Sequence, residues 1–385
     1  MASHTFTNLI PDALEAMDVV SRELVGMIPS VQSSMSGERV ALNTNIRSFS
    51  TPALTASDVT PSATRPEGQS VTFGNVALAI TKARQVDINW NGEQTLANKG
   101  TGNFSRMTVD LMSQAMRTLV NEIESDLCSA AALGASRAYG TAGTTPFASD
   151  LSDPAQVRKI LDDNGAPATG RSFVIDTAAG AKMRTLTNLT KANESGDTSL
   201  LRQGVLLDLH GFAIRESAQV KTVTKGTAAS ATTNAAGYAV GATTITLASA
   251  GTGAFIVGDI VTFAGDTNKY LVVTGDTDTS NGGTIVLAAP GLRQAIAASA
   301  TAITVVNTAT RNMAFSRNAI VLATRLPAMP EGGDAAVDES IITDPRTGLS
   351  MRFALYKQNH QNAYVFEVAW GQAVIKPEHL ALSLG

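Results

Sequence analysis

The side chains that most often carry catalysis or bind metals are few in this 385-residue chain. Its four histidines, His4, His210, His360 and His379, lie far apart, and Cys128 is the only cysteine. Zinc sites usually draw on closely spaced histidine and cysteine pairs, and none of these residues has such a neighbour. A single cysteine also excludes an internal disulfide. We therefore expect no metal centre and no cofactor, and we expect Cys128 to be a small buried hydrophobe.

Sequence signatures of common enzymes are also missing. The chain has no GxSxG, GxxxxGK[ST], HExxH or strand-to-helix GxGxxG pattern. Gly100-Thr101-Gly102 precedes a predicted helix, where an anion could bind. No parallel strand is predicted before it and no lysine follows it, so a turn is the favoured interpretation. The sequence thus indicates a protein that is not an enzyme.

One acidic loop, Gly275 to Gly283, has the alternating carboxylates of a calcium loop. Asp276 and Asp278 are spaced as at the start of an EF-hand. The closing glutamate is absent, and the flanking segments are predicted strands instead of helices. We therefore expect a solvated hairpin loop. Its carboxylates are candidates for contact with a basic patch on a neighbouring subunit.

Composition narrows the function further. Charged residues make up 16% and aromatic residues 5% of the chain, and the net charge is −4. Such a balance argues against a disordered polyelectrolyte and against a protein that grips phosphates, which needs a basic surface. The abundance of small residues is typical of chains with extended arms covered by neighbours. A chain of 385 residues is also long enough for two or three sub-domains.

The first residues, Met1 to Pro11, lack the basic and apolar regions of a secretory signal peptide. No apolar run approaches the roughly 20 residues that a membrane-spanning helix needs. From the sequence we expect a protein that is made and kept in the cytoplasm.

The elements that would position these residues begin with a helix, which either docks on its own subunit or lies on a neighbour, and with a two-stranded arm. Apolar residues at helical spacing predict a helix from Thr5 to Met27. Alternating residues then predict strands over 40–46 and 76–88, joined by a Pro/Thr/Ser-rich tip. Two strands around a polar tip form a long arm, which is marginal alone and is best explained if another chain supports it. Arg65 and Glu67, at the tip, are candidates for contact with that chain.

Residues 104–134 give the clearest prediction, a long helix. Apolar residues recur every three or four positions, and neither Pro nor Gly interrupts them before Gly134. At 1.5 Å per residue the helix would be roughly 45 Å long, which suits a structural spine. We expect Glu122, Glu124 and Asp126 to lie on its solvated side.

In the second half of the chain the predicted secondary structure changes twice. Residues 152–220 alternate predicted helices and strands and indicate an α/β module. From 221 to 309, short Thr-rich strands follow one another with turns every 10 or so residues, which is typical of a small barrel or sandwich. The α/β pattern of residues 152–220 resumes at Arg311. We therefore interpret residues 221–309 as an inserted β domain.

The closing segment, Tyr364 to Leu384, predicts a strand, a break at Trp370-Gly371, a second apolar run and the sequence Lys376-Pro377-Glu378. It resembles the terminal strand pair of tailed-phage major capsid proteins of the HK97-like fold. Less specific local matches accompany it: Arg171-Ser-Phe-Val-Ile-Asp176, Leu201-Arg-Gln-Gly204 with His210-Gly-Phe212, and Asn312-Met-Ala-Phe-Ser-Arg317. Taken in order, the predicted elements extend the resemblance over essentially the whole chain. The insertion resembles that of the coat protein of short-tailed Salmonella phages (Lederbergvirus).

The resemblance implies an α+β, HK97-like fold with a small all-β insertion domain. Its parts would be an N-terminal arm (1–36), an extended two-stranded arm or E-loop (37–99), a P domain with the spine helix (100–150), the first part of an A domain (151–220), the insertion (221–309) and the completion of the A and P domains (310–385). No crosslinking pair is recognisable.

The implied function is mechanical. Copies of the chain would form hexamers and pentamers of an icosahedral head that encloses double-stranded DNA without sequence-specific contact. A scaffolding protein and a portal would take part, and the protein would end in the virion. Two other interpretations remain open. An encapsulin-like shell of a cellular compartment shares the fold, and a bacterial surface protein would share the Thr/Gly-rich strands.

Overall fold

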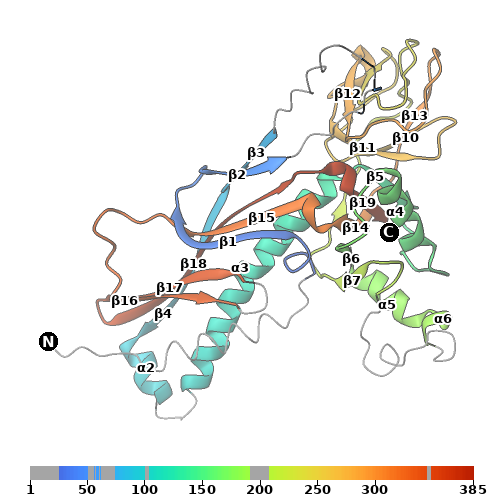
Figure 1. Ribbon diagram of the computed structural model, residues 1–385. Coiled ribbons are helices and arrows are strands. Elements are labelled where there is room, and N and C mark those ends of the chain that lie inside the picture. The colour runs from blue at the N-terminus through green and yellow to red at the C-terminus, as the bar shows by residue number, and fades with distance from the viewer. Residues whose placement is uncertain are drawn as a thin grey trace.

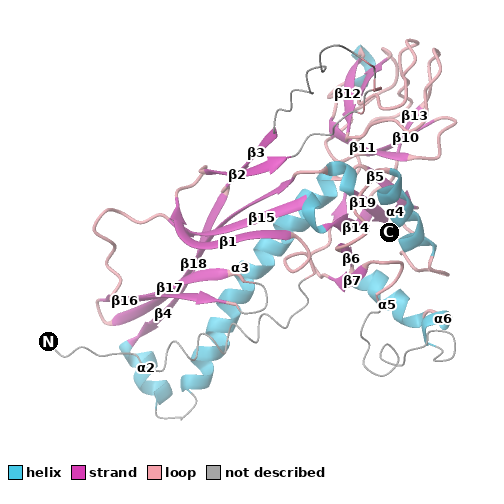
Figure 2. Cartoon of the chain, viewed as in Figure 1, coloured by secondary structure: helices cyan, strands magenta, loops and turns pink. Residues whose placement is uncertain are grey.

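The computed structural model describes residues 26–50, 56, 58–59, 61, 74–99, 104–190, 208–344 and 348–385. One large sheet lies along a long helix, and a second large sheet lies at the end of that helix. A strand-rich lobe continues from the second sheet (Figures 1 and 2). None of the described helices is long and apolar enough to span a membrane.

The long helix is α3, Phe104–Gly134, and it confirms the helix predicted over these residues. Its apolar stripe, which includes Met112, Met116, Leu119, Ile123 and Leu127, is almost fully buried. Cys128 lies in the same stripe and is buried, as expected. A helix with one continuous apolar stripe needs a flat surface to cover, and the first sheet supplies it.

The first sheet is built around strand β18, Gln361–Val374. Strand β4 (Lys82–Asn91) pairs with one side of it, while β17 (Ser350–Gln358) and β15 (Ile320–Pro327) share the other. Strand β1 (Gln32–Val40) runs parallel to β15, and β16 (Asp338–Thr343) pairs with β17. The short helix α2 (Gly92–Lys99) follows β4. The residues of β18 that face α3, such as Phe366 and Trp370, belong to the largest core cluster.

The predicted break at Trp370-Gly371 is wrong, because β18 runs through Gly371 without interruption. Glycine is needed there for another reason. A Cβ atom on Gly371 would lie 2.0 Å from the carbonyl oxygen of Ala79. The end of strand β3 (Gly74–Ala79) therefore crosses β18 at backbone contact, which only glycine allows.

The second sheet has β19, Leu380–Leu384, near its middle. Strand β19 pairs with β14 (Ala309–Ser316) on one side and with β5 (Arg137–Gly140) on the other. Strands β6 (Arg171–Ile175) and β7 (Ala213–Glu216) extend it beyond β14. The two strands of the closing segment thus lie in different sheets and do not pair with each other. The 3-10 turn η3 (Pro377–His379) joins them.

Helices α4 (Ser152–Asp163), α5 (Thr177–Thr185) and α6 (Thr187–Thr190) accompany the second sheet. The core cluster beneath them contains Phe147, Phe173 and Phe212, whose rings pack in tilted pairs about 6 Å apart (6.1 and 5.9 Å between centroids). Asp176 begins α5 by accepting hydrogen bonds from the amides of Ala178 and Ala179. The helices and strands alternate here, as the sequence predicts for the described part of 152–220.

The segment from 221 to 309 is built from short strands, and it has its own core cluster, which includes Phe255, Phe263 and Leu287. Its elements are β8 (Thr222–Val223), β9 (Thr244–Leu247), β10 (Ile260–Phe263), β11 (Lys269–Thr274), η1 (Thr279–Asn281), β12 (Gly283–Leu287) and β13 (Ile303–Val305); η2 (Arg317–Ala319) follows β14. Strand β11 pairs with β5, so these strands continue the second sheet and are not detached from it.

A two-stranded hairpin, β2 (Asn45–Ser50) with β3 (Gly74–Ala79), leaves the first sheet. It overlaps the predicted two-stranded arm in part: the predicted strands 40–46 and 76–88 meet it only at 45–46 and 76–79, and residues 82–88 belong to β4 of the first sheet. The predicted helix from Thr5 falls almost entirely outside the described residues. Arg65 and Glu67, the candidate contact residues of the tip, lie outside them too.

The backbone contact at Gly371 leads to a first prediction. Changing Gly371→Ala forces the new methyl group against the Ala79 carbonyl, and we expect a loss of about 3 kcal/mol in the free energy of unfolding, the upper end for overpacking. Gly37→Ala is the matched control, because its Cβ would meet only the end of Ile341 at 3.7 Å. Urea unfolding of the two variants compares them. Equal stabilities would contradict the close approach.

Candidate assembly interface

The structure corrects the expectation that Glu122, Glu124 and Asp126 lie on the solvated side of α3: Glu124 is buried, and the side chains of Glu122 and Asp126 are only 31% and 16% exposed. Glu122 and Asp126 bind Lys82 of β4 at 3.2 and 2.8 Å, and Arg84 contacts Glu122 at 3.2 Å. Asp126 also accepts a hydrogen bond from the indole of Trp370, at 3.0 Å. Partial burial lowers the pKa of Lys82, but its bonds to Asp126 and Glu122 outweigh that effect and leave the pKa raised.

Glu124 is fully buried and lies further inward than its neighbours. It accepts hydrogen bonds from three backbone amides, at Gly26, Met27 and Ile28, and from the hydroxyl of Ser217. A signal for this was present in the sequence. Position 124 falls four residues after Val120 and three before Leu127, on the apolar stripe.

Apart from the ion pairs of Glu122 and Asp126, Asp110 is the only charged residue among the exposed residues in the described part of α3. The exposed residues of its described part are mostly apolar or neutral: Met107, Asp110, Leu111, Gln114, Thr118 and Leu133. Met107 and Leu111 are each 38% exposed. Exposed helix faces of soluble proteins usually carry many charges. An outer helix face with so few charges is typical of a surface that another element covers.

The β2–β3 hairpin is the second unusual surface. It pairs with no other described strand and stands away from both large sheets (Figure 1). At its base, Leu78 and Ile80 pack on Val321, Ala323 and Ala369. A lone hairpin of this kind is marginally stable in water. It needs an additional contact surface, which the rest of the described chain does not provide.

A third feature lies on the face of the first sheet that points away from α3. Arg352 of β17 is only 3% exposed and is bound by three carboxylates. Its guanidinium contacts Asp334 at 2.8 Å and both Glu339 and Glu367 at 2.9 Å. Tyr356 donates a hydrogen bond to Asp334. Arg39 of the parallel strand β1 reaches Glu339 as well, at 3.2 Å.

These contacts control the charge of Asp334. Slight burial raises the pKa of its carboxyl, but hydrogen bonds from Tyr356, the Ala336 amide and Arg352 outweigh this and lower the pKa to about 2. For Arg352, burial lowers the pKa, but the hydrogen bonds to Glu367 and Asp334 outweigh this and raise the pKa well beyond the ordinary arginine value. Asp334 and Arg352 therefore stay ionised at neutral pH.

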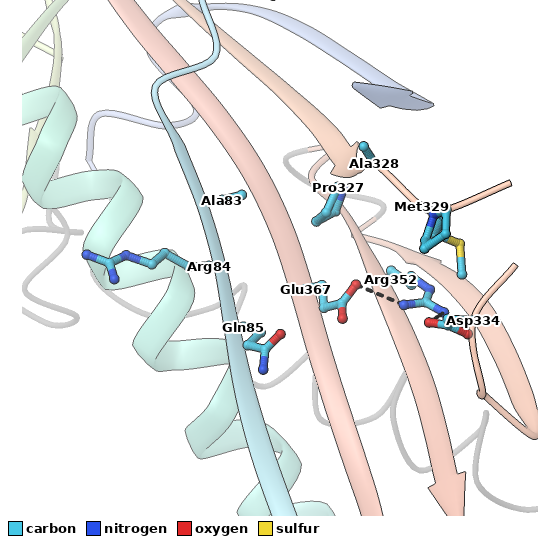
Figure 3. Close-up of a pocket in the computed structure, with 10 residues that line it drawn as sticks. Ala83, Arg84, Gln85, Pro327, Ala328, Met329, Asp334, Arg352 and Glu367 are labelled. Atoms are coloured by element: carbon cyan, nitrogen blue, oxygen red, sulfur yellow. Dashed lines mark hydrogen bonds and ion pairs between the residues drawn. The ribbon is translucent and has the colours of Figure 1, made fainter. Parts of the chain in front are cut away.

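The cluster borders a groove of about 450 Å³ (Figure 3). Strand β4 supplies one wall, the segment after β15 the other, and Glu367 and Arg352 the floor; the wall residues are Ala83, Arg84, Gln85, Pro327, Ala328, Met329 and Pro330. Asp334 fastens the 328–337 loop over this groove. No sequence pattern marked the cluster, because its members come from three strands and a loop.

The acidic loop 275–283 contains Asp276 and Asp278, the other predicted contact residues. Asp278 begins the turn η1 by accepting hydrogen bonds from Ser280, and these lower the pKa of its carboxyl. Asp276 accepts a bond from the Asp278 amide and pairs through its backbone with Phe255. Both side chains thus shape their own loop. Within the residues that the structure describes, no three His, Cys, Asp or Glu side chains are grouped to hold a metal ion.

The Arg352 cluster gives a second prediction. Changing Arg352→Met leaves three carboxylates facing one another without their buried cation, and we expect a loss of about 3–5 kcal/mol in the free energy of unfolding. Changing Arg39→Met removes a more exposed partner of the same glutamate, and should cost less than about 1 kcal/mol. Chemical denaturation at pH 7 measures both.

Acid should weaken the same cluster. The lowered pKa of Asp334 contributes stability above its ordinary pKa of 3.8, and this contribution is lost as the pH falls toward about 2. The loss should be visible as exposure of the 328–337 loop to protease between those values. A loop that stays equally protected at both ends of the range would contradict the assignment.

Comparison with known proteins gives similarity in structure alone. No protein-family model matches this chain, and no curated protein matches it. It is similar to a structure of Mycobacterium phage Che8, with 12% identity over 89% of this chain and 84% of that one, and a TM-score of 0.47. The capsid of Cyanophage P-SCSP1u matches at 10% identity over 92% and 86%, with a TM-score of 0.48. A virus-like particle from Pyrococcus furiosus matches at 8% identity over 98% and 100%, with a TM-score of 0.45. At these identities and TM-scores, the similarities assign neither a family nor a function to this chain.

Proposed function

We propose that this chain is the major capsid protein of a tailed phage and that it builds a closed shell from many copies of itself. The observation that supports this most directly is that one subunit carries two separate surfaces that each need a covering partner. Among the described residues the β2–β3 hairpin pairs with no other strand, and Asp110 is the only charged residue among the exposed residues in the described part of α3. In a shell each surface would be completed by a neighbouring copy.

The contact would be heterologous, because a hairpin on one subunit meets a helix on the next. Heterologous contacts generate rings and, when they curve, closed shells. Hexamers and pentamers of an icosahedral head are the arrangement that we propose, with the HK97-like domains implied by the sequence. The Lederbergvirus branch and the domain boundaries given above are parts of the same proposal.

The shell would enclose double-stranded DNA without reading its sequence. A net charge of −4 supports an inner wall that does not hold DNA tightly. Assembly through a scaffolded procapsid, entry of DNA through a portal and a final location in the virion complete the proposal. The contacts of Arg65, Glu67, Asp276 and Asp278 with neighbours belong to it as well.

The first test is expression of the chain alone, followed by sedimentation and negative-stain electron microscopy. Closed shells, tubes or shell fragments tens of nanometres across are expected. A species that stays monomeric at high concentration, and also with a co-expressed scaffold, would contradict the proposal. Shells that form in the cell around a protein cargo, with no DNA, would favour the compartment shell instead.

A third prediction tests the outer face of α3 directly. Changing Thr118→Asp places a charge in the middle of that face, where we expect it to be desolvated by the neighbouring copy. Particle yield should fall at least tenfold. Thr118→Val is the matched control, since it removes the same hydroxyl bond to the Gln114 carbonyl but adds no charge.

Both Thr118 variants should fold, because Thr118 is exposed in the single chain. Circular dichroism of the unassembled proteins checks this point. Normal particle yield from the Thr118→Asp variant would show that no neighbour covers this face.

A further inference from the structure

Asparagine is chemically labile, and it loses its side-chain amide most readily where glycine follows it. The glycine favours the reaction because it has no Cβ atom to keep its backbone nitrogen away from the asparagine side chain. A fold suppresses the reaction where it holds both the side chain and the glycine N–H in place. The chain contains three such pairs, and the structure holds them very differently: Asn91-Gly92, Asn164-Gly165 and Asn281-Gly282.

The pair at Asn91 is held on both sides. Asn91 Oδ1 accepts a hydrogen bond from the Gln94 amide at 2.7 Å, and the Gln94 side chain accepts one from the Asn91 amide at 3.2 Å. This reciprocal arrangement is a capping box. The Gly92 N–H donates to the His360 carbonyl at 3.0 Å. Strand β4 ends and helix α2 begins at this pair, so the reacting groups cannot meet unless regular structure is broken.

The pair at Asn164 is held by even more bonds. Its Nδ2 donates to the Glu378 carbonyl at 2.8 Å and to the Ser136 hydroxyl at 3.2 Å. Its Oδ1 accepts a bond from Arg137 at 3.1 Å. The N–H of the following glycine donates to the Asp162 carbonyl at 3.0 Å. All the polar atoms that would take part in the reaction are therefore occupied.

The pair at Asn281 is held much less. It lies in the acidic loop 275–283, where the Asn281 side chain is exposed. Its Nδ2 donates to Asp278, also exposed, at 2.7 Å, and its Oδ1 accepts no bond from the described residues. The Gly282 N–H lies 3.4 Å from the Thr279 carbonyl, which is long for a hydrogen bond. Exposed bonds, which water can replace, contribute little net stability, so little free energy keeps the two reacting groups apart.

We propose that Asn281 is a site of spontaneous covalent modification, at which the side-chain amide is lost and a carboxylate is added to the acidic loop. The backbone nitrogen of Gly282 attacks Asn281 Cγ, and a succinimide ring forms. The C–N bond of the side-chain amide breaks, and its nitrogen leaves as ammonia with the proton of the Gly282 N–H. Water then opens the ring at either carbonyl and leaves aspartate or isoaspartate. The inference does not depend on the shell function.

The reaction would change the turn that Asp278 begins. Before it, the Asn281 amide donates to the Asp278 carboxylate. After it, position 281 carries a carboxylate, and two like charges face each other. Hydrogen bonds from Ser280 lower the pKa of Asp278, so this group stays ionised at neutral pH and the repulsion remains. We therefore expect the turn η1 to loosen while the loop becomes more acidic.

The test is incubation of the purified full chain at pH 8, followed by digestion and mass spectrometry. The peptide that contains Asn281 should deamidate at least tenfold faster than those with Asn91 and Asn164, because more hydrogen bonds must break at those two sites first. Isoaspartate should be among its products. The same chain in concentrated urea is the control. Without the fold, the three pairs should react at similar rates.

Two variants test the chemistry itself. Gly282→Ala places a methyl group beside the attacking nitrogen and should slow the reaction at Asn281 at least tenfold. Gly282 has a φ of 71°, where alanine is strained, so Asn281→Gln supplements it. Glutamine keeps an amide at this position but would need a larger ring, so residue 281 should stay unmodified over the same period.

A third variant, Asn281→Asp, reproduces one product and tests its effect. Amide hydrogen exchange of residues 280–282 should rise at least tenfold, with less than a twofold change in strands β11 and β12. Unchanged exchange of residues 280–282 would contradict the loosening of the turn.

Three results would overturn the modification site. Equal rates at the three pairs in the folded chain would mean that the fold does not single out Asn281. An Asn281 that persists in the folded chain while the unfolded chain reacts would mean that the loop protects it. Deamidation without isoaspartate, or at an unchanged rate in Gly282→Ala, would mean that the Gly282 nitrogen is not the attacking group.

Discussion

The seam of charged side chains between helix α3 and strands β4 and β18 is the contact on which the rest of the subunit depends. Lys82 bridges Glu122 and Asp126, and Trp370 adds a hydrogen bond from the opposite strand. The seam fixes the rotation of the helix about its own axis. With that rotation fixed, the methionine- and leucine-rich stripe meets the sheet, Glu124 faces the interior, and a side with few charges faces out.

Strand β18 performs two tasks that a shorter strand could not. Its first half pairs with β17, and its second half pairs with β15, so that one strand aligns two parts of the sheet end to end. The side chains that face α3 are aromatic and apolar, while Glu367, on the opposite face, binds Arg352. At Gly371 the strand allows the base of the β2–β3 hairpin to cross at backbone contact. One strand thus positions the helix, the hairpin and the charged cluster.

Local pattern was enough to predict the long helix and the short strands after residue 221, because each depends on spacing within a few residues; it placed the hairpin strands only in part and merged one of them with β4. The position of Glu122 and Asp126 could not be predicted in this way, since their partners Lys82 and Trp370 are far away in sequence. The Arg352 cluster was missed for the same reason. Gly371 was interpreted as a strand break because a close backbone crossing leaves no local signal that differs from a turn. Glu124 is different, because its place on the apolar stripe was visible.

The route of the chain through β19 has a consequence for how the subunit folds. Strand β5 cannot be completed until β19 arrives, and the Ser136 hydroxyl bonds to a carbonyl 244 residues further along. The Asp126–Trp370 bond spans the same separation, 244 residues. Folds dominated by such distant pairings form slowly. For most of its synthesis the chain therefore has an unfinished second sheet and a helix without its covering strand. During that time these apolar surfaces are open to wrong partners, and a chaperone that shields them would raise the yield of correctly folded subunits.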